Sequence, residues 1–205
     1  MNGPGLTTLQ QRLGYAFTDP ALLSLALTHS SASPVNYERL EHLGDAVLEL
    51  AVTHWLYQDF PQFGPGQLSI LRAELVCAKT LAQLARELDL PQVLRLSRPA
   101  AARGLHQRPG VLSEALEAVL GALFLDAGSR LPPVERVVRA LCAPQAHAVI
   151  CSNPQFYQLP PPRESGPPFT AGGCASRGGL AAPDSRATRG SYLTEEVFDE
   201  SVCIR

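Results

Sequence analysis

Apolar residues recur at spacings of three and four along the chain up to about Ile150, with no run of strand-like alternation. This pattern predicts an all-α protein. The expected helices cover residues 7–13, 37–57, 67–76, 78–88, 112–126 and 134–141, together with a helix that begins at Pro20. A loop containing Pro99, Gly104 and Pro109 is expected before the helix at 112–126.

Two of these helices carry clear signals. Asp19 is a typical N-cap, and Pro20 after it suits the first helical position. The segment 37–57 is the longest, and its apolar residues cover broad faces. We therefore expect a central helix that other helices contact on most of its sides.

The pattern ends after about Cys151. The last 55 residues contain 7 Pro and 6 Gly, and periodicity returns only in a short stretch near residues 192–198. We predict one helical domain over residues 1–150 and a disordered tail over residues 151–205. The tail is either a flexible extension without activity or a segment that binds a partner.

Composition and charge narrow the class of protein. The chain is 45% hydrophobic and 18% charged, with a net charge of −2, as in ordinary globular proteins. Its apolar runs are far shorter than the roughly 20 residues of a membrane span, and the N-terminus does not resemble a secretory signal. Five cysteines without a Cys-x-x-Cys pair indicate neither a zinc site nor a disulfide framework. These features predict a cytoplasmic protein without a membrane segment or an organic cofactor.

Three acidic residues lie within the expected central helix. Glu38, Glu41 and Asp45 are spaced by three and four residues, which places them along one stripe of the helix. A solvated face could carry these like charges. Because apolar residues surround them in the sequence, a bound cation is the other explanation.

A second acidic pair, Glu114 and Glu117, repeats the spacing in the helix expected at 112–126. Two such groups on packed helices can face one another. Magnesium prefers oxygen ligands and commonly keeps several waters, so carboxylates around a shared cleft would suit it. Such a site suits hydrolysis of a phosphodiester.

Two segments carry a family resemblance. The stretch ERLEHLGDA at residues 38–46 resembles the signature of the ribonuclease III family, and SEALEAVLGALFLDAG at residues 113–128 resembles its second acidic block. The likeness extends over about residues 6–142. It implies the all-α ribonuclease III endonuclease domain fold and a homodimer that cuts double-stranded RNA, such as ribosomal or messenger precursors. It also implies products with 5′-phosphate and 3′-hydroxyl ends.

The resemblance assigns roles to the acids. It implies that Glu41, Asp45, Glu114 and Glu117 bind Mg²⁺, for which Mn²⁺ can substitute, and that Glu38 is a supporting acid. Asp45 and Glu117 are the expected catalytic residues.

Three residues depart from the family's pattern. Glu114 replaces the usual Asp, His42 replaces an aromatic hydrophobe, and Pro65 stands where many members have an acidic residue. Glu114 and Pro65, together with the lack of a recognisable RNA-binding domain, favour an alternative, a non-catalytic ribonuclease III-like protein that binds RNA or serves as a structural component on the ribosome. The retained carboxylates favour the enzyme.

RNA binding is expected to be weak. Residues 151–205 contain no Lys and lack the αβββα periodicity of the double-stranded RNA binding domain that follows the nuclease domain in bacterial members, so that domain is not expected here. Salt-sensitive binding by a few arginines is expected instead. The candidates are Arg72, Arg95, Arg98, Arg103 and Arg108.

Overall fold

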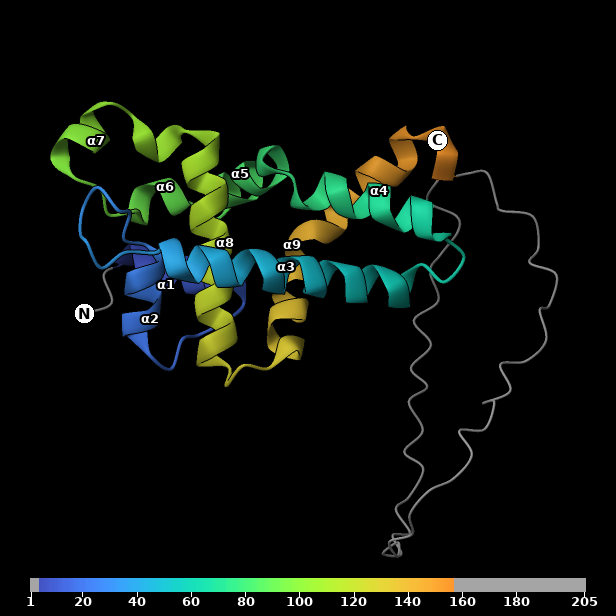
Figure 1. Cartoon of the computed structure of the whole chain (residues 1–205), viewed down its shortest axis with the longest axis horizontal. Helices are drawn as coiled ribbons and strands as arrows, with labels where there is room; N and C mark the ends of the chain where they lie inside the picture. Colours follow the sequence, from blue (N-terminus) through green and yellow to red (C-terminus); the bar gives the residue numbers. More distant parts are fainter. Residues whose placement is uncertain (1–3, 157–205) are drawn as a thin grey trace, which may run out of the picture. The chain divides into compact units, whose positions relative to one another are not determined.

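The computed structural model describes residues 4–156, which form helices joined by short loops (Figure 1). The helices are α1 (Pro4–Leu13), α2 (Pro20–Ala26), α3 (Glu38–Asp59), α4 (Pro65–Val76), α5 (Ala78–Glu87), α6 (Leu90–Val93), α7 (Arg98–Ala102), η1 (Leu105–Gln107), α8 (Pro109–Asp126), α9 (Leu131–Ser152) and η2 (Pro154–Phe156). Within this range, extended pairing is limited to one isolated bridge between Thr28 and Arg95. The all-α prediction is confirmed.

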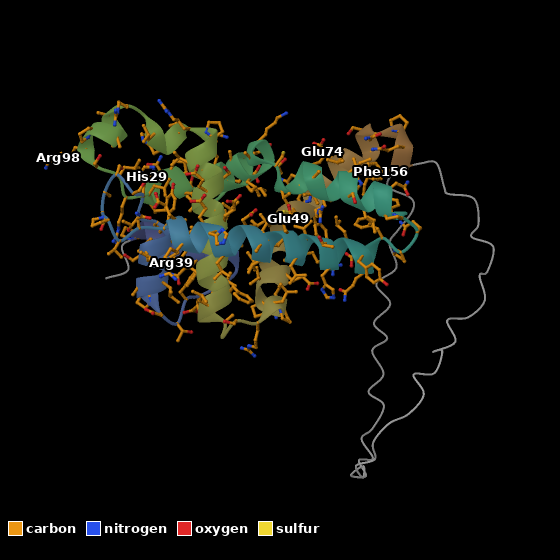
Figure 2. The ribbon with its side chains drawn as sticks, viewed as in Figure 1. His29, Arg39, Glu49, Glu74, Arg98 and Phe156 are labelled. Atoms are coloured by element: carbon orange, nitrogen blue, oxygen red, sulfur yellow. The ribbon has the colours of Figure 1, made fainter. Side chains whose placement is uncertain are left out.

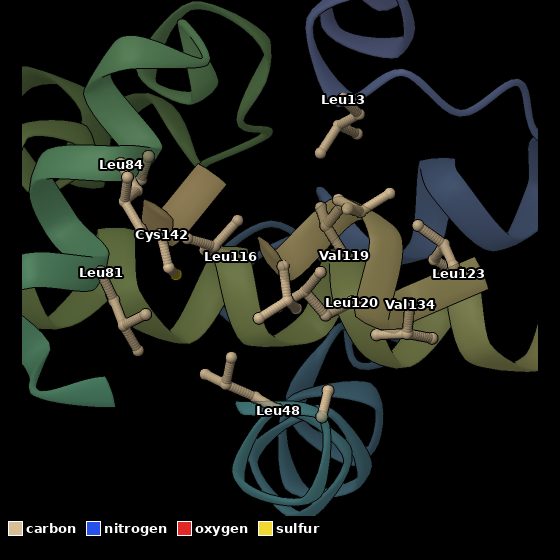
Figure 3. Packing of buried hydrophobic residues seen from close by; sticks show 14 of the residues in the cluster. Leu13, Leu48, Leu81, Leu84, Leu116, Val119, Leu120, Leu123, Val134 and Cys142 are labelled. Atoms are coloured by element: carbon tan, nitrogen blue, oxygen red, sulfur yellow. The ribbon is translucent and has the colours of Figure 1, made fainter. Parts of the chain in front are cut away.

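Helix α8 lies at the centre of the core, a place that the sequence predicts for the segment 37–57, which forms most of α3. Its residues from Leu112 to Leu123 are buried except for Glu114 and Glu117, and α2, α3, α5 and α9 pack around it. Figure 3 shows Leu116, Val119 and Leu120 of α8 among side chains from α3, α5 and α9. Despite this apolar character, no helix within residues 4–156 is long and apolar enough to cross a bilayer. Glu114 and Glu117 are thus the two residues in this stretch of α8 whose side chains reach toward solvent.

Helices α3 and α8 cross at two glycines, and the ribbon shows α3 running across α8 (Figure 1). A Cβ atom on Gly44 would collide with the carbonyl oxygen of Glu117, and one on Gly121 would collide with the carbonyl oxygen of Leu40. Only glycine permits two backbones to approach so closely. Gly44 and Gly121 therefore allow α3 and α8 to approach one another closely at this crossing.

The end of α8 is joined to the loop before α2. Asp126 accepts hydrogen bonds from the Tyr15 hydroxyl at 2.8 Å and from the backbone N–H groups of Thr18 at 2.9 Å and Asp19 at 2.7 Å. Asp19 is the expected N-cap, since its carboxylate accepts from the N–H of Ala21. These bonds hold the N-terminal segment against the central helix.

Several predicted boundaries are wrong. The segment expected as a loop before 112 contains α7 and η1, and α8 begins at Pro109, because proline suits the first helical position. The helix expected at 134–141 is α9, which continues through Pro144 to Ser152. Residues 151–156, predicted as the start of the disordered tail, instead form the end of α9 and η2, and the rest of that tail, from residue 157 onward, lies outside the described residues.

Candidate metal centre

The five predicted acids come from two helices. Glu38, Glu41 and Asp45 lie in the first turns of α3, and Glu114 and Glu117 lie in α8. The glycine crossing explains their proximity, since the backbone of Glu117 touches Gly44, the residue before Asp45. The structure therefore brings together the two acidic groups that the sequence predicted.

The acids differ in exposure. Glu41, Glu114 and Glu117 are half-buried, whereas Glu38 and Asp45 are exposed. The group thus spans the boundary between the core and the solvent, where carboxylates can meet a ligand that arrives from water.

Electrostatic coupling relates these side chains. Burial raises the pKa of Glu117 to about 7, and the charges of Asp45, Glu41 and Glu114 add to the effect. Burial also raises the pKa of Glu41, with further contributions from Glu114, Glu38 and Asp45 and a small opposing one from His42. Glu41 and Glu117 therefore each lie within the field of neighbouring carboxylates.

Within residues 4–156, no basic residue neutralises the acidic group by direct pairing. The ion pairs among residues 4–156 all lie elsewhere: Arg12–Asp89, His54–Glu135, Arg72–Glu49 and Arg139–Asp59. Uncompensated carboxylate oxygens are the donor set that a hard divalent cation prefers.

The group is not a finished coordination sphere. In the part of the chain that the structure describes, no cluster of three or more His, Cys, Asp or Glu side chains is arranged to hold a metal ion. The fit to magnesium therefore rests on the chemistry of the oxygen donors, and the ligand roles of the four acids stay a prediction.

Tyr37 is a member of this site that the sequence reasoning missed. Its hydroxyl donates a hydrogen bond to Oε2 of Glu114 at 3.0 Å, although the residue is only 1% exposed. Burial, followed by the charge of Glu114, raises the pKa of Tyr37. A tyrosine directly before the acidic stripe was the available signal, because a buried tyrosine hydroxyl usually has a partner.

Two of the departing residues have plain structural positions. His42 is exposed on α3 and lies close enough to Glu41 to lower the pKa of that carboxyl slightly, against the larger effects that raise it. Pro65 is the first residue of α4, where a missing N–H costs nothing, and it carries no carboxylate. The third departure, Glu114, is the partner of Tyr37.

The predicted RNA-binding arginines do not form one group. Arg95, Arg98, Arg103 and Arg108 are exposed between α6 and α8. Arg72 lies on α4 and pairs with Glu49 at 3.2 Å. Figure 2 places Arg98 at one end of the molecule and Glu49 well away from it. Arg72, which pairs with Glu49, is therefore separated from Arg98.

Known proteins resemble this chain over most of the helical region. Residues 19–141 match the family model described as Ribonuclease-III-like. The chain is 50% identical over 137 residues to Ribonuclease 3 of Variovorax paradoxus, an alignment that covers 67% of this chain and 59% of the relative. The chain thus spans less than two thirds of that relative's length.

Solved structures agree with this similarity. The nuclease domain of ribonuclease III from Campylobacter jejuni matches with a TM-score of 0.65 and 39% identity, covering 70% of this chain and 97% of that one. A second structure of that domain, described as showing structural flexibility in the region involved in dimer formation, matches with a TM-score of 0.62 and 41% identity, covering 65% and 93%. The family match over residues 19–141 includes both α3 and α8, the helices that carry the acids.

Proposed function

The chain belongs to the ribonuclease III family, and from this premise we propose that it is an endoribonuclease that hydrolyses phosphodiester bonds in double-stranded RNA. In this proposal the reaction depends on Mg²⁺, leaves 5′-phosphate and 3′-hydroxyl ends, and processes ribosomal or messenger precursors in the cytoplasm. RNA binding is weak and salt-sensitive, because the net charge is −2 and the exposed arginines between α6 and α8 are few.

One observation carries the proposal. Two helices meet at a pair of glycines, and this crossing gathers carboxylates that no Lys or Arg within residues 4–156 neutralises. A solvated acidic stripe would not require burial of Glu117 beside Asp45, which is unfavourable for the negative charge of Glu117. Binding of a divalent cation between these carboxylates would explain why the fold keeps this unfavourable arrangement.

The acids have separate tasks in this proposal. Glu41 and Glu117 would supply carboxylate oxygens directly to the ion, while Asp45 and Glu114 would complete its surroundings and Glu38 would support them. Bound magnesium lowers the pKa of a water molecule and stabilises negative charge on phosphate oxygens. The partly buried position of Glu117 limits competing water around its carboxylate.

Cleavage of a long, perfectly paired RNA by the full chain tests the proposal. We expect magnesium-dependent products with 5′-phosphate ends from the wild type, and a loss of at least about 100-fold in rate for Glu117→Ala, as for removal of a group that acts in the transition state. Glu87→Ala is the matched control, because Glu87 is an exposed glutamate at the end of α5. Its rate is expected to equal that of the wild type.

The same assay separates the alternative. A folded chain that binds duplex RNA but does not cleave it with magnesium or manganese would contradict the enzyme and favour a non-catalytic, RNA-binding or ribosome-associated role. Equal rates for Glu117→Ala and the wild type would contradict the assigned site.

We also propose that the protein is a homodimer, with α3 and α4 providing the contact surface. Leu50 and Tyr57 lie seven residues apart on α3, so they share a face, and they are 56% and 73% exposed. Ile70 of α4 is 39% exposed. A pocket of about 90 Å³ lies between the two helices, lined by Thr53, Leu56, Tyr57, Leu68, Ser69 and Arg72. An apolar face with a pocket is typical of a protein interface.

A further inference from the structure

A single carboxylate in the acidic site is held by another side chain. Among the residues that the structure describes, Glu114 is the one acid of the five that accepts a hydrogen bond, and its donor is the hydroxyl of Tyr37 at 3.0 Å. The two residues are 77 positions apart in the sequence. Tyr37 directly precedes α3, and Glu114 belongs to α8. The bond therefore spans the two acidic groups.

The donor itself is rigid. The backbone N–H of Tyr37 donates to the carbonyl of Thr28 at 2.9 Å, and its carbonyl accepts from the N–H of Glu41 at 2.9 Å. The ring is almost fully buried and meets the ring of His29 edge to face, with centroids 5.6 Å apart. His29 is in turn held by the N–H of Ser31 at 2.9 Å, and Figure 2 shows it near the beginning of α3. The Tyr37 hydroxyl is thus a fixed point on the protein.

A fixed donor changes what Glu114 can do. A glutamate side chain has several rotatable bonds, and ordering it around a ligand loses conformational entropy. A hydrogen bond to one carboxylate oxygen removes part of that freedom before any ligand binds and leaves the other oxygen available. Groups that orient ligands in this way typically alter metal affinity by about 10–100-fold.

We infer that Tyr37 is a positioning residue that holds Oε2 of Glu114 and so prepares this carboxylate to take part in binding a divalent cation. The inference rests on the proposed function, since it requires Glu114 to act as a ligand. A purely structural role would also use the bond to join α3 to α8, so the decisive property is metal affinity.

The inference can be tested without catalysis by titrating the full chain with manganese. Electron paramagnetic resonance measures the concentration of the free ion and so gives the Kd. Tyr37→Phe keeps the ring and removes the hydroxyl. We expect its Kd for manganese to rise by about 10-fold, while circular dichroism shows the same helical content. In a Glu114→Ala background, adding Tyr37→Phe should change the Kd no further, because Tyr37 acts through that carboxylate.

Tyr15→Phe is the matched control, since Tyr15 also donates to a carboxylate, that of Asp126 at 2.8 Å, away from the acidic group. It should lower the melting temperature without altering the Kd. Equal manganese affinity in Tyr37→Phe and the wild type would overturn the inference but not the proposed function. Further weakening by Tyr37→Phe in the Glu114→Ala background would also overturn it. A wild-type chain that binds no manganese would overturn both.

Discussion

At the scale of single residues, the acidic site opposes the stability of the fold. Burial of Glu117 raises its pKa to about 7, so its ionised form is disfavoured in the folded chain. In the unfolded chain the same carboxyl titrates near about 4.3. A folded pKa above the unfolded one makes the protein less stable as the pH rises between these values.

Glu117→Gln should therefore stabilise the protein when no metal is bound. We expect the free energy of unfolding near pH 8 to increase by about 1 kcal/mol, a figure reduced for the partial exposure of the side chain. Near pH 5 the difference should be smaller, because the folded wild type is already protonated there. Urea denaturation in EDTA measures both values. A variant less stable than the wild type near pH 8 would contradict this account.

The residues of the site were predictable to different degrees. The spacing of Glu41 and Asp45, and of Glu114 and Glu117, was enough to predict an acidic stripe on each helix, because helical periodicity fixes which side chains share a stripe. It left open whether the two stripes face one another, and the family resemblance supplied that expectation. Tyr37 was not predictable in this way. Its partner is 77 residues away, and helical spacing cannot report a contact at such a distance along the chain.

At the scale of helices, the crossing of α3 and α8 sets the position of the site. Gly121→Ala should lower the free energy of unfolding by about 2–4 kcal/mol. Its Cβ would collide with the carbonyl oxygen of Leu40, and because that oxygen belongs to a helix backbone, the collision can be relieved only by a shift of the whole helix. It should also weaken manganese binding by moving Glu117 away from α3. Chemical denaturation and metal titration measure the two effects.

Gly66 provides the control for that substitution. It lies within α4 and has open space where a Cβ would stand. Gly66→Ala should be neutral or stabilising by up to about 1 kcal/mol, since alanine is the better helix former. If Gly121→Ala were equally harmless, the backbones could not be in contact at the crossing.

The stability that comes from the hydrogen bonds between α8 and the segment before α2 should depend on pH. Hydrogen bonds from Thr18, Asp19 and Tyr15 hold the pKa of Asp126 below its usual range, although burial opposes them. A lowered carboxyl pKa contributes stability above the unfolded value of about 3.9 that is lost as the pH falls through the folded value. Asp126→Asn should therefore destabilise the protein at neutral pH, and this difference should shrink near pH 3 in thermal melts. A constant difference would contradict the link.

Helix boundaries were less predictable than helix existence. Local rules stop a helix at proline, yet α9 contains Pro144 and continues to Ser152. Apolar residues beyond that proline, such as Ala146 and Val149, pack against the core. Tertiary burial thus outweighs the lost backbone hydrogen bond, and a sequence read segment by segment does not show that contribution.

At the scale of the whole molecule, the exposed face of α3 and α4 predicts the oligomeric state. Leu50→Asp places a charge in this apolar face and should convert the dimer to a monomer with unchanged helical content, because burying an unpaired charge in an interface is costly. Light scattering after size-exclusion chromatography measures the mass. Val35→Asp is the control, since Val35 is 70% exposed in the loop before α3. A Leu50→Asp dimer would exclude this face as the contact.

The contact between Gly44 and Gly121 also restricts which substitutions this sequence can accept during evolution. In most cores, a larger residue on one helix can be compensated by a smaller one opposite it. Here each glycine meets the backbone of the other helix, and a backbone cannot be made smaller by substitution. No single replacement elsewhere can therefore rescue a side chain at either position, so both positions are closed to substitution as long as the helices cross in this way.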